Sequence, residues 1–142
     1  MSTKNILEKF ITAQKEDFNT ALSEIKNGHK DSHWIWYIFP QIAGLGRSAM
    51  SEYYAIQNLS EAKMYLENAF LHNNLLTICQ ELLNLQTSDA EEVFGWIDSI
   101  KLKSSMTLFA LADSEEPVFK QVLDKFFNGE FDERTIGIVN GQ

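Results

Sequence analysis

Cysteine, proline and long apolar runs are scarce in this chain, whose 142 residues include one Cys and two Pro. The single thiol, Cys79, excludes an intramolecular disulfide and offers no thiolate cluster for zinc or an iron–sulfur centre. It lies in the apolar run LLTICQELL, which favours a buried, inert thiol over a nucleophile. No apolar run reaches the roughly 18 residues of a membrane span, and the segment MSTKNILEKF carries charges where a signal peptide is apolar. We therefore expect a cytoplasmic protein that does not enter membranes.

Basic residues are also few, with 12 Lys and Arg against 20 Asp and Glu and a net charge of -8. Non-specific binding to duplex nucleic acid requires many cations that release counterions, so we expect no nucleic-acid partner. Net charge does not describe a single cleft, and Arg47, Lys101 and Lys103 remain candidates for a local basic pocket. His29 and His72 have no second ligand at the spacing of zinc sites, so we predict no metal and no cofactor.

Apolar residues recur at three- and four-residue steps along most of the chain, as is typical of amphipathic helices. The predicted helices are residues 6–25, 60–68, 70–85, 88–95, 98–111 and 117–127. Ser60 and Ser88 are the expected N-caps, and Gly95 is an expected stop. No alternating strand pattern competes with these helices. We predict one domain over residues 1–142, a compact all-α bundle of about seven short-to-medium helices.

Residues 32–40, SHWIWYIFP, combine large amphipathic rings with specific polar groups. They fit two helical turns that begin at a Ser32 cap and stop at Pro40, with His33, Trp36 and Tyr37 on one side. An imidazole between indoles can act as an acid or base, and indole faces can stack a nucleobase or sugar. The alternative is structural, with His33 capping a carbonyl and the rings of Trp34 and Trp36 filling the core.

Residues 40–48, PQIAGLGRS, follow as a glycine-containing turn. The glycines allow backbone N–H groups to point outward, Ser48 can cap the next helix, and Arg47 can add a charge-assisted contact to an anion. The spacing matches neither the dinucleotide fingerprint nor the P-loop. A plain tight turn before a capped helix is the alternative.

Residues 101–109, KLKSSMTLF, carry a second group of polar side chains. On a helix, Lys101, Ser104 and Ser105 share one sector, and a desolvated lysine amine next to a serine hydroxyl can activate it for acyl transfer. The serines can instead permit close helix packing and bond back to the preceding turn. We assign no residue a catalytic role.

The motifs GHKDSHWIWYIFPQIAGLGRS, YYAI, KLKSSMTLF and FFNGEFDERT, together with Ala13-Gln14, span nearly the whole chain in this order. They closely resemble the family called domain of unknown function 1810, whose members occur in bacteria and fungi and some of which carry a calpastatin label. The resemblance implies a compact multi-helical domain and assigns no activity.

Two functional hypotheses follow from these segments. In the first, residues 33–48 and 101–107 meet and bind or process a small anionic metabolite, such as a nucleotide or an ADP-ribose-like molecule. In the second, the chain is a non-enzymatic interaction module, in the simplest case a homodimer, and the tryptophan-rich segment is an interface or core. The candidate ligand-binding residues are His33, Trp34, Trp36, Gln41, Arg47, Ser48, Lys101, Ser104 and Ser105.

Overall fold

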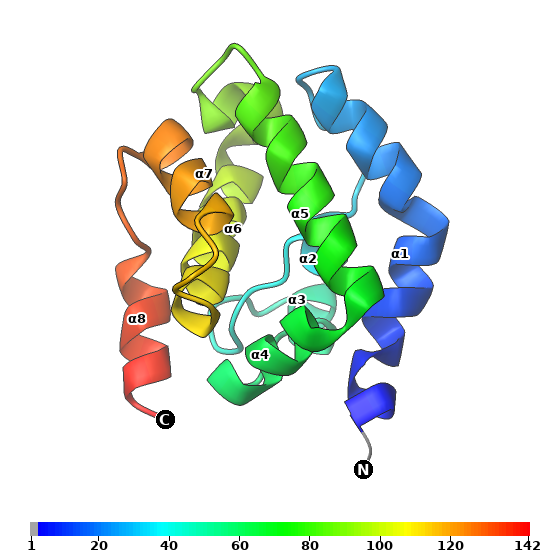
Figure 1. The fold of residues 1–142 in the computed structure, drawn as a ribbon, viewed down its shortest axis with the longest axis vertical. Coiled ribbons are helices and arrows are strands. Elements are labelled where there is room, and N and C mark those ends of the chain that lie inside the picture. Colours follow the sequence, from blue (N-terminus) through cyan, green and yellow to red (C-terminus); the bar gives the residue numbers. More distant parts are fainter. Residues whose placement is uncertain (1–2) are drawn as a thin grey trace.

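The computed structural model describes residues 3–142, which fold into eight helices (Figure 1). These are α1 (Thr3–Lys26), α2 (Ile35–Ile38), α3 (Ala49–Tyr53), α4 (Leu59–Glu67), α5 (Ala69–Asn84), α6 (Ala90–Ala112), α7 (Val118–Phe127) and α8 (Glu133–Asn140). Within this described part of the chain, extended backbone pairs at one isolated bridge, between Ile42 and Ile56. The predicted all-α fold class is confirmed.

The central position of α2 decides where the candidate segments lie. Helix α5 packs against α1 and α7, while α6 packs against α4, α7 and α8 (Figure 1). The short α2 contacts both α1 and α6. Residues 35–38 are therefore held between the N-terminal helix and the helix that carries KLKSSMTLF.

Two helix starts differ from the expected ones. The predicted N-caps Ser60 and Ser88 are wrong, because Asn58 begins α4 and Asp89 begins α6. Asn58 Oδ1 accepts a hydrogen bond from a backbone N–H at 2.9 Å, and Asp89 Oδ1 accepts one at 3.0 Å. Asn and Asp cap as well as Ser does, so spacing alone did not identify the capping residue. The predicted Ser48 cap is confirmed, since Ser48 Oγ accepts the N–H of Ser51 at 3.1 Å.

Gly95 kinks α6 instead of ending it. Its φ of 80° and ψ of 166° lie outside the helical region, and the helix then continues to Ala112. Glycine tolerates a positive φ because it has no Cβ. The separate helix predicted from residue 98 is thus part of α6. Directly after the kink, Trp96 and Ile97 are 64% and 63% exposed.

Buried apolar side chains form one cluster that joins all the longer helices. Aromatic rings run through it, with Tyr65 and Phe109 centroids 5.1 Å apart and Phe109 and Phe119 centroids 5.7 Å apart. Cys79 is fully buried in this cluster, and burial raises the pKa of its thiol well above the ordinary value. The prediction of a buried thiol is confirmed.

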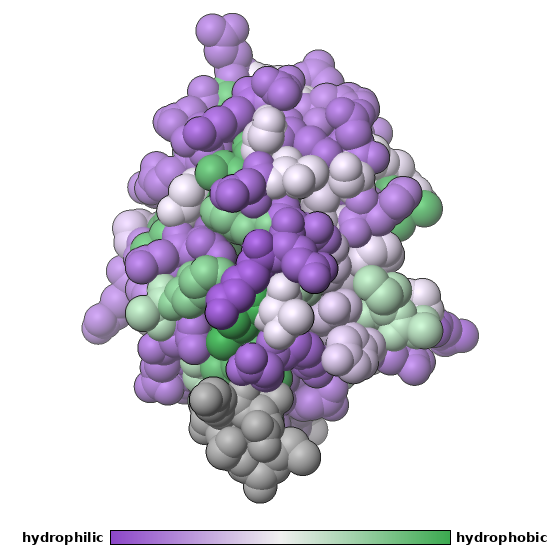
Figure 2. All heavy atoms as spheres, turned by 90° about the vertical axis from the view of Figure 1, so that its right-hand side faces the viewer, coloured by the Kyte–Doolittle hydropathy of each residue, from purple (hydrophilic) through white to green (hydrophobic). Residues whose placement is uncertain are grey.

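The outer surface on the α1 side is mainly hydrophilic, with small separate apolar areas (Figure 2). In residues 3–142, no helix combines the length and apolar character that crossing a membrane requires.

Candidate functional site

Glu24, near the end of α1, organises the entry to the tryptophan-rich segment. Its Oε1 accepts the backbone N–H groups of Asp31 and Ser32 at 2.8 and 2.9 Å, and the Trp34 indole N–H at 2.9 Å. Its Oε2 accepts the Ser32 hydroxyl at 2.5 Å. Burial by itself raises the pKa of Glu24, but these hydrogen bonds outweigh burial and lower the pKa from 4.5 to about 2. The sequence patterns did not identify this residue.

Helix α2 is a single turn, shorter than the two turns expected. Trp34 occupies its N-cap position without a side-chain cap, so the predicted Ser32 cap is wrong. The Glu24 carboxylate takes the Ser32 hydroxyl and N–H instead, which explains the later helix start. Trp34 is buried, with its ring 6.3 Å from those of Phe39 and Phe94.

Three of the candidate residues meet at the junction between residues 32–48 and α6. Trp36, Gln41 and Lys101 line a narrow crevice of about 10 Å³, room for about one water molecule. Lys101 Nζ lies 5.3 Å from the Trp36 ring centroid, within cation–π range. Among the described residues, the buried Trp36 Nε1 has no hydrogen-bond partner. Residues 32–48 and α6 therefore come together, as expected, at the side chains of Trp36, Gln41 and Lys101.

A wider cleft of about 150 Å³ opens beside this crevice and shares Gln41 and Lys101 with it. Leu45, Trp96 and Arg134 complete its principal lining. Both cations have distant partners, because Lys101 Nζ is 3.8 Å from Asp98 and Arg134 Nε is 3.6 Å from Asp132. Charge-assisted hydrogen bonds are typically about 2.7–2.9 Å long, so neither cation is tightly neutralised.

The two candidate serines of α6 face the interior. Ser104 Oγ donates to a carboxylate oxygen of Asp132 at 3.1 Å, and that same oxygen accepts the Thr135 hydroxyl at 2.6 Å. Ser105 is fully buried, and its Oγ has no partner among the described residues. Lys101 Nζ instead lies over the Trp36 ring, so the geometry resembles the packing alternative more than a serine–lysine pair.

The remaining candidates lie around the turn and at its start. His33 is exposed, and its backbone carbonyl accepts the Tyr37 hydroxyl at 3.3 Å. Arg47 is exposed next to Ser48, which caps α3. Gly46 lines the cleft, where an added Cβ would stand 2.5 Å from Ser51. The turn therefore packs closely against the start of α3.

Sequence patterns missed two residues of this cleft. Arg134 is the second residue of the last helix, and Trp96 follows the kink at Gly95. The sequence signal of Arg134 was a cation inside the FFNGEFDERT motif, and that of Trp96 was a tryptophan after a glycine. Neither signal locates a side chain next to Gln41, because that proximity arises from tertiary packing of α6 and α8.

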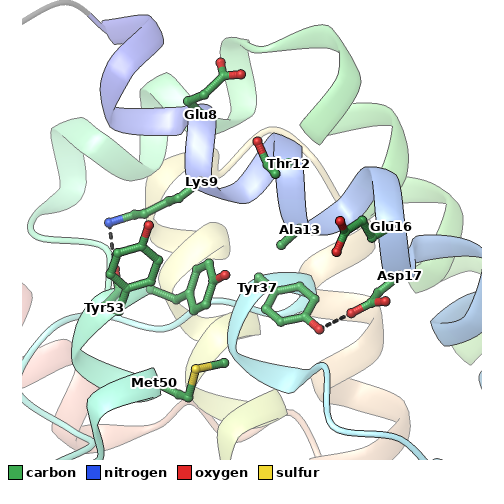
Figure 3. Close-up of a pocket in the computed structure, with 10 residues that line it drawn as sticks. Glu8, Lys9, Thr12, Ala13, Glu16, Asp17, Tyr37, Met50 and Tyr53 are labelled. Atoms are coloured by element: carbon green, nitrogen blue, oxygen red, sulfur yellow. Dashed lines mark hydrogen bonds between the residues drawn. The ribbon is translucent and has the colours of Figure 1, made fainter.

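A second cavity, of about 570 Å³, lies between α1 and α3 (Figure 3). Its chemically distinctive lining consists of Glu8, Glu16, Asp17, Tyr37, Tyr53 and Tyr54. Asp17 accepts the Tyr37 hydroxyl. None of the nine candidate residues lines this cavity.

The comparisons with known proteins agree with this helical architecture. The model of the family described as "Protein of unknown function (DUF1810)" matches residues 4–139. The crystal structure of the conserved hypothetical protein Rv1873 from Mycobacterium tuberculosis is 36% identical in sequence and superposes with a TM-score of 0.92, covering 94% of this chain and 96% of that one. No curated protein matches the chain.

Proposed function

The chain belongs to the DUF1810 family of proteins of unknown function, and we propose that it binds a small anionic metabolite of the nucleotide or ADP-ribose type. The binding site is the cleft between Gln41, Lys101 and Arg134. The observation that carries this proposal is the convergence of two loosely paired cations and one amide on a single cleft. These groups come from three separate segments.

The pairing of Lys101 explains why its charge is available. Asp98 gives its other oxygen to Lys30 at 2.8 Å, and the Lys30 side chain is only 6% exposed. Its interaction with Lys101 is an ångström longer, at 3.8 Å. An anion that enters the cleft therefore competes with a weak partner at Lys101, and the planar guanidinium of Arg134 can take two of its oxygens.

The size of the cleft indicates which part of the ligand it holds. Small-molecule pockets are typically about 300–1,000 Å³, so a cleft of about 150 Å³ seats a phosphate-sized head. The exposed Trp96 ring at the edge offers a face on which a nucleobase stacks. In this arrangement Gln41, Lys101 and Arg134 contact the ligand, and Trp36 lines the adjoining crevice. Trp34, Ser104 and Ser105 are buried and support the cleft from the interior.

Isothermal titration with AMP and ADP-ribose tests this proposal, with neutral adenosine as the probe for charge recognition. We expect Lys101→Gln and Arg134→Gln each to weaken binding by at least about tenfold, the loss of one charge-assisted contact. Lys120→Gln, an exposed lysine on α7, is the matched control and leaves affinity unchanged. Absence of binding by both anions, or equal affinity in all three variants, would falsify the proposal.

The exposed Trp96 and Ile97 favour a second candidate, self-association through the kinked start of α6. Large exposed apolar side chains that lie together are typical of interaction surfaces. Analytical ultracentrifugation of the wild type and Trp96→Ser decides this point. A dimer in the wild type that dissociates in the variant supports the interaction module, whereas a monomer at all concentrations eliminates it.

A further inference from the structure

The cavity between α1 and α3 has a continuous aromatic wall. The Tyr54 ring centroid lies 4.8 Å from that of Tyr53 and 5.1 Å from that of Tyr37. Tyr53 remains 57% exposed although it lines the cavity. Figure 3 shows Tyr37 next to Asp17 and Tyr53 next to Lys9, at two places along α1. The cavity is thus bounded by π faces on one side and by a charged helix on the other.

Acidic side chains of α1 give this cavity a negative potential. Glu8, Glu16 and Asp17 line it, against the single cation Lys9. Burial raises the pKa of Tyr54, and the neighbouring Tyr53 and the carboxylates of Asp17 and Glu16 raise it further. Because a helix rises about 1.5 Å per residue, Glu8 and Asp17 are separated by roughly 13 Å along α1. Carboxylates therefore line the cavity at two separate places along α1.

Lys9 shows that the aromatic wall accepts an ammonium group. Its Nζ lies 5.2 Å from the Tyr53 ring centroid and 5.5 Å from that of Phe10, and it donates to the Tyr53 carbonyl at 2.7 Å (Figure 3). Both ring distances are within cation–π range. The structure thus contains one ammonium on this wall, while the carboxylates of Glu8 and Glu16 line the same cavity.

We propose that this cavity binds a linear polyamine, with its terminal ammonium groups at the Glu8 and Glu16–Asp17 ends and its methylene chain along the tyrosine rings. The cavity volume of about 570 Å³ is adequate for a small organic molecule. A compact monocation would neutralise one end only, whereas a polyamine has charges at both ends and apolar segments between them. This site is separate from the cleft lined by Lys101 and Arg134, because the two have no described lining residue in common.

Isothermal titration with spermidine, and with butylamine and choline as single-charge probes, tests the assignment. We expect spermidine to bind at least about tenfold more tightly than either monocation, and Glu8→Gln/Glu16→Gln to remove this advantage. Glu91→Gln/Glu92→Gln replaces two exposed first-turn glutamates of α6 that do not line the cavity, makes the same charge change and leaves affinity unchanged. It therefore controls for non-specific attraction to an acidic protein.

Lys9→Gln should increase the affinity for spermidine, a change that partial unfolding of the variant would not produce. Removal of the resident ammonium frees the Tyr53 face and eliminates repulsion, so spermidine should bind several-fold more tightly. Thermal unfolding of each variant without ligand verifies the fold. The proposal is overturned if spermidine does not bind, if choline binds as tightly as spermidine, or if the Glu8/Glu16 and Glu91/Glu92 variants lose affinity equally. None of these outcomes depends on Lys101 or Arg134, so the two proposals fail or succeed separately.

Discussion

The carboxylate of Glu24 should make the stability of this protein depend on pH in a defined window. It accepts four hydrogen bonds from residues 31–34, and its pKa falls from 4.5 to about 2 in the folded state. Because the unfolded state binds the proton more tightly, the stabilisation is complete above pH 4.5 and is lost as the pH falls toward 2. Glu24→Gln keeps the shape of the side chain and removes the charge.

The magnitude follows from the pKa difference. One pKa unit corresponds to about 1.36 kcal/mol, so a fall from 4.5 to about 2 sets an upper limit of about 3.4 kcal/mol. Glu24 is only half-buried, and solvent screening lowers this to about 2 kcal/mol. The loss of charge-assisted hydrogen bonds gives a similar figure.

Urea unfolding of the wild type and Glu24→Gln at several pH values measures this contribution. We expect the variant to be less stable by about 2 kcal/mol at pH 7, and the difference to shrink by roughly half at pH 3. The m-value should stay unchanged, since the surface exposed on unfolding is the same. A stability difference that is equal at pH 7 and pH 3 would refute the conclusion that the charge of Glu24 stabilises the fold. A variant as stable as the wild type would refute it too.

Three further predictions concern the interior and the turn. Ser105→Ala should change the melting temperature little or raise it, because the buried hydroxyl has no partner among the described residues. Ser104→Ala should cost about 1–2 kcal/mol of stability, because it removes a hydrogen bond to a buried carboxylate. A Ser105→Ala variant that is less stable than Ser104→Ala would contradict this interpretation. Gly46→Ala should destabilise the protein by about 1–3 kcal/mol, since its Cβ would stand 2.5 Å from the Ser51 side chain. Gly137→Ala in α8, where an added Cβ has no neighbour within 4 Å, should be neutral or stabilising in thermal unfolding. Cys79 should react with a thiol reagent only at the rate of unfolding, because the side chain is fully buried and reagent cannot reach it; burial also raises the pKa of the thiol. Rapid labelling of the native protein would contradict this.

The longer helices could be predicted from sequence because each one buries a stripe of apolar residues, whereas α8, in which the buried residue is Thr135, was not predicted. In α7, for example, Phe119, Val122, Leu123 and Phe126 are all buried, and that spacing is the periodicity of a helix. The predicted end at residue 127 is confirmed, and the C-cap residue Asn128 has a φ of 56° in the left-handed region. The short α2 was predicted as two turns because Ser32 looks like a local cap, whereas Glu24 from α1 takes its hydrogen bonds. A contact eight residues distant in sequence has no local signature.

The candidate cleft was accessible to sequence reasoning only in part. Trp36, Gln41 and Lys101 stand in two unusual segments, and the structure brings them to one crevice. Arg134 was not predicted because it is 33 positions beyond Lys101 and nothing local places α8 beside the turn. The tyrosine-lined cavity gave no signal either, because carboxylates such as Glu16 on an exposed helical face are indistinguishable from ordinary solvated charges.

The net charge of -8 excludes neither proposed ligand, because each cavity responds to its own lining. At physiological ionic strength, exposed charges more than about 8 Å apart are largely screened. Lys101 and Arg134 therefore set the potential of one cleft, while Glu8 and Glu16 set that of the cavity beside α1. Tyr54 lines both the α1–α3 cavity and the Trp36 crevice, so one residue borders both the acidic cavity and the crevice that contains Lys101. An acidic composition thus governs encounter with charged molecules, whereas the local arrangement of a few side chains determines which of them is retained.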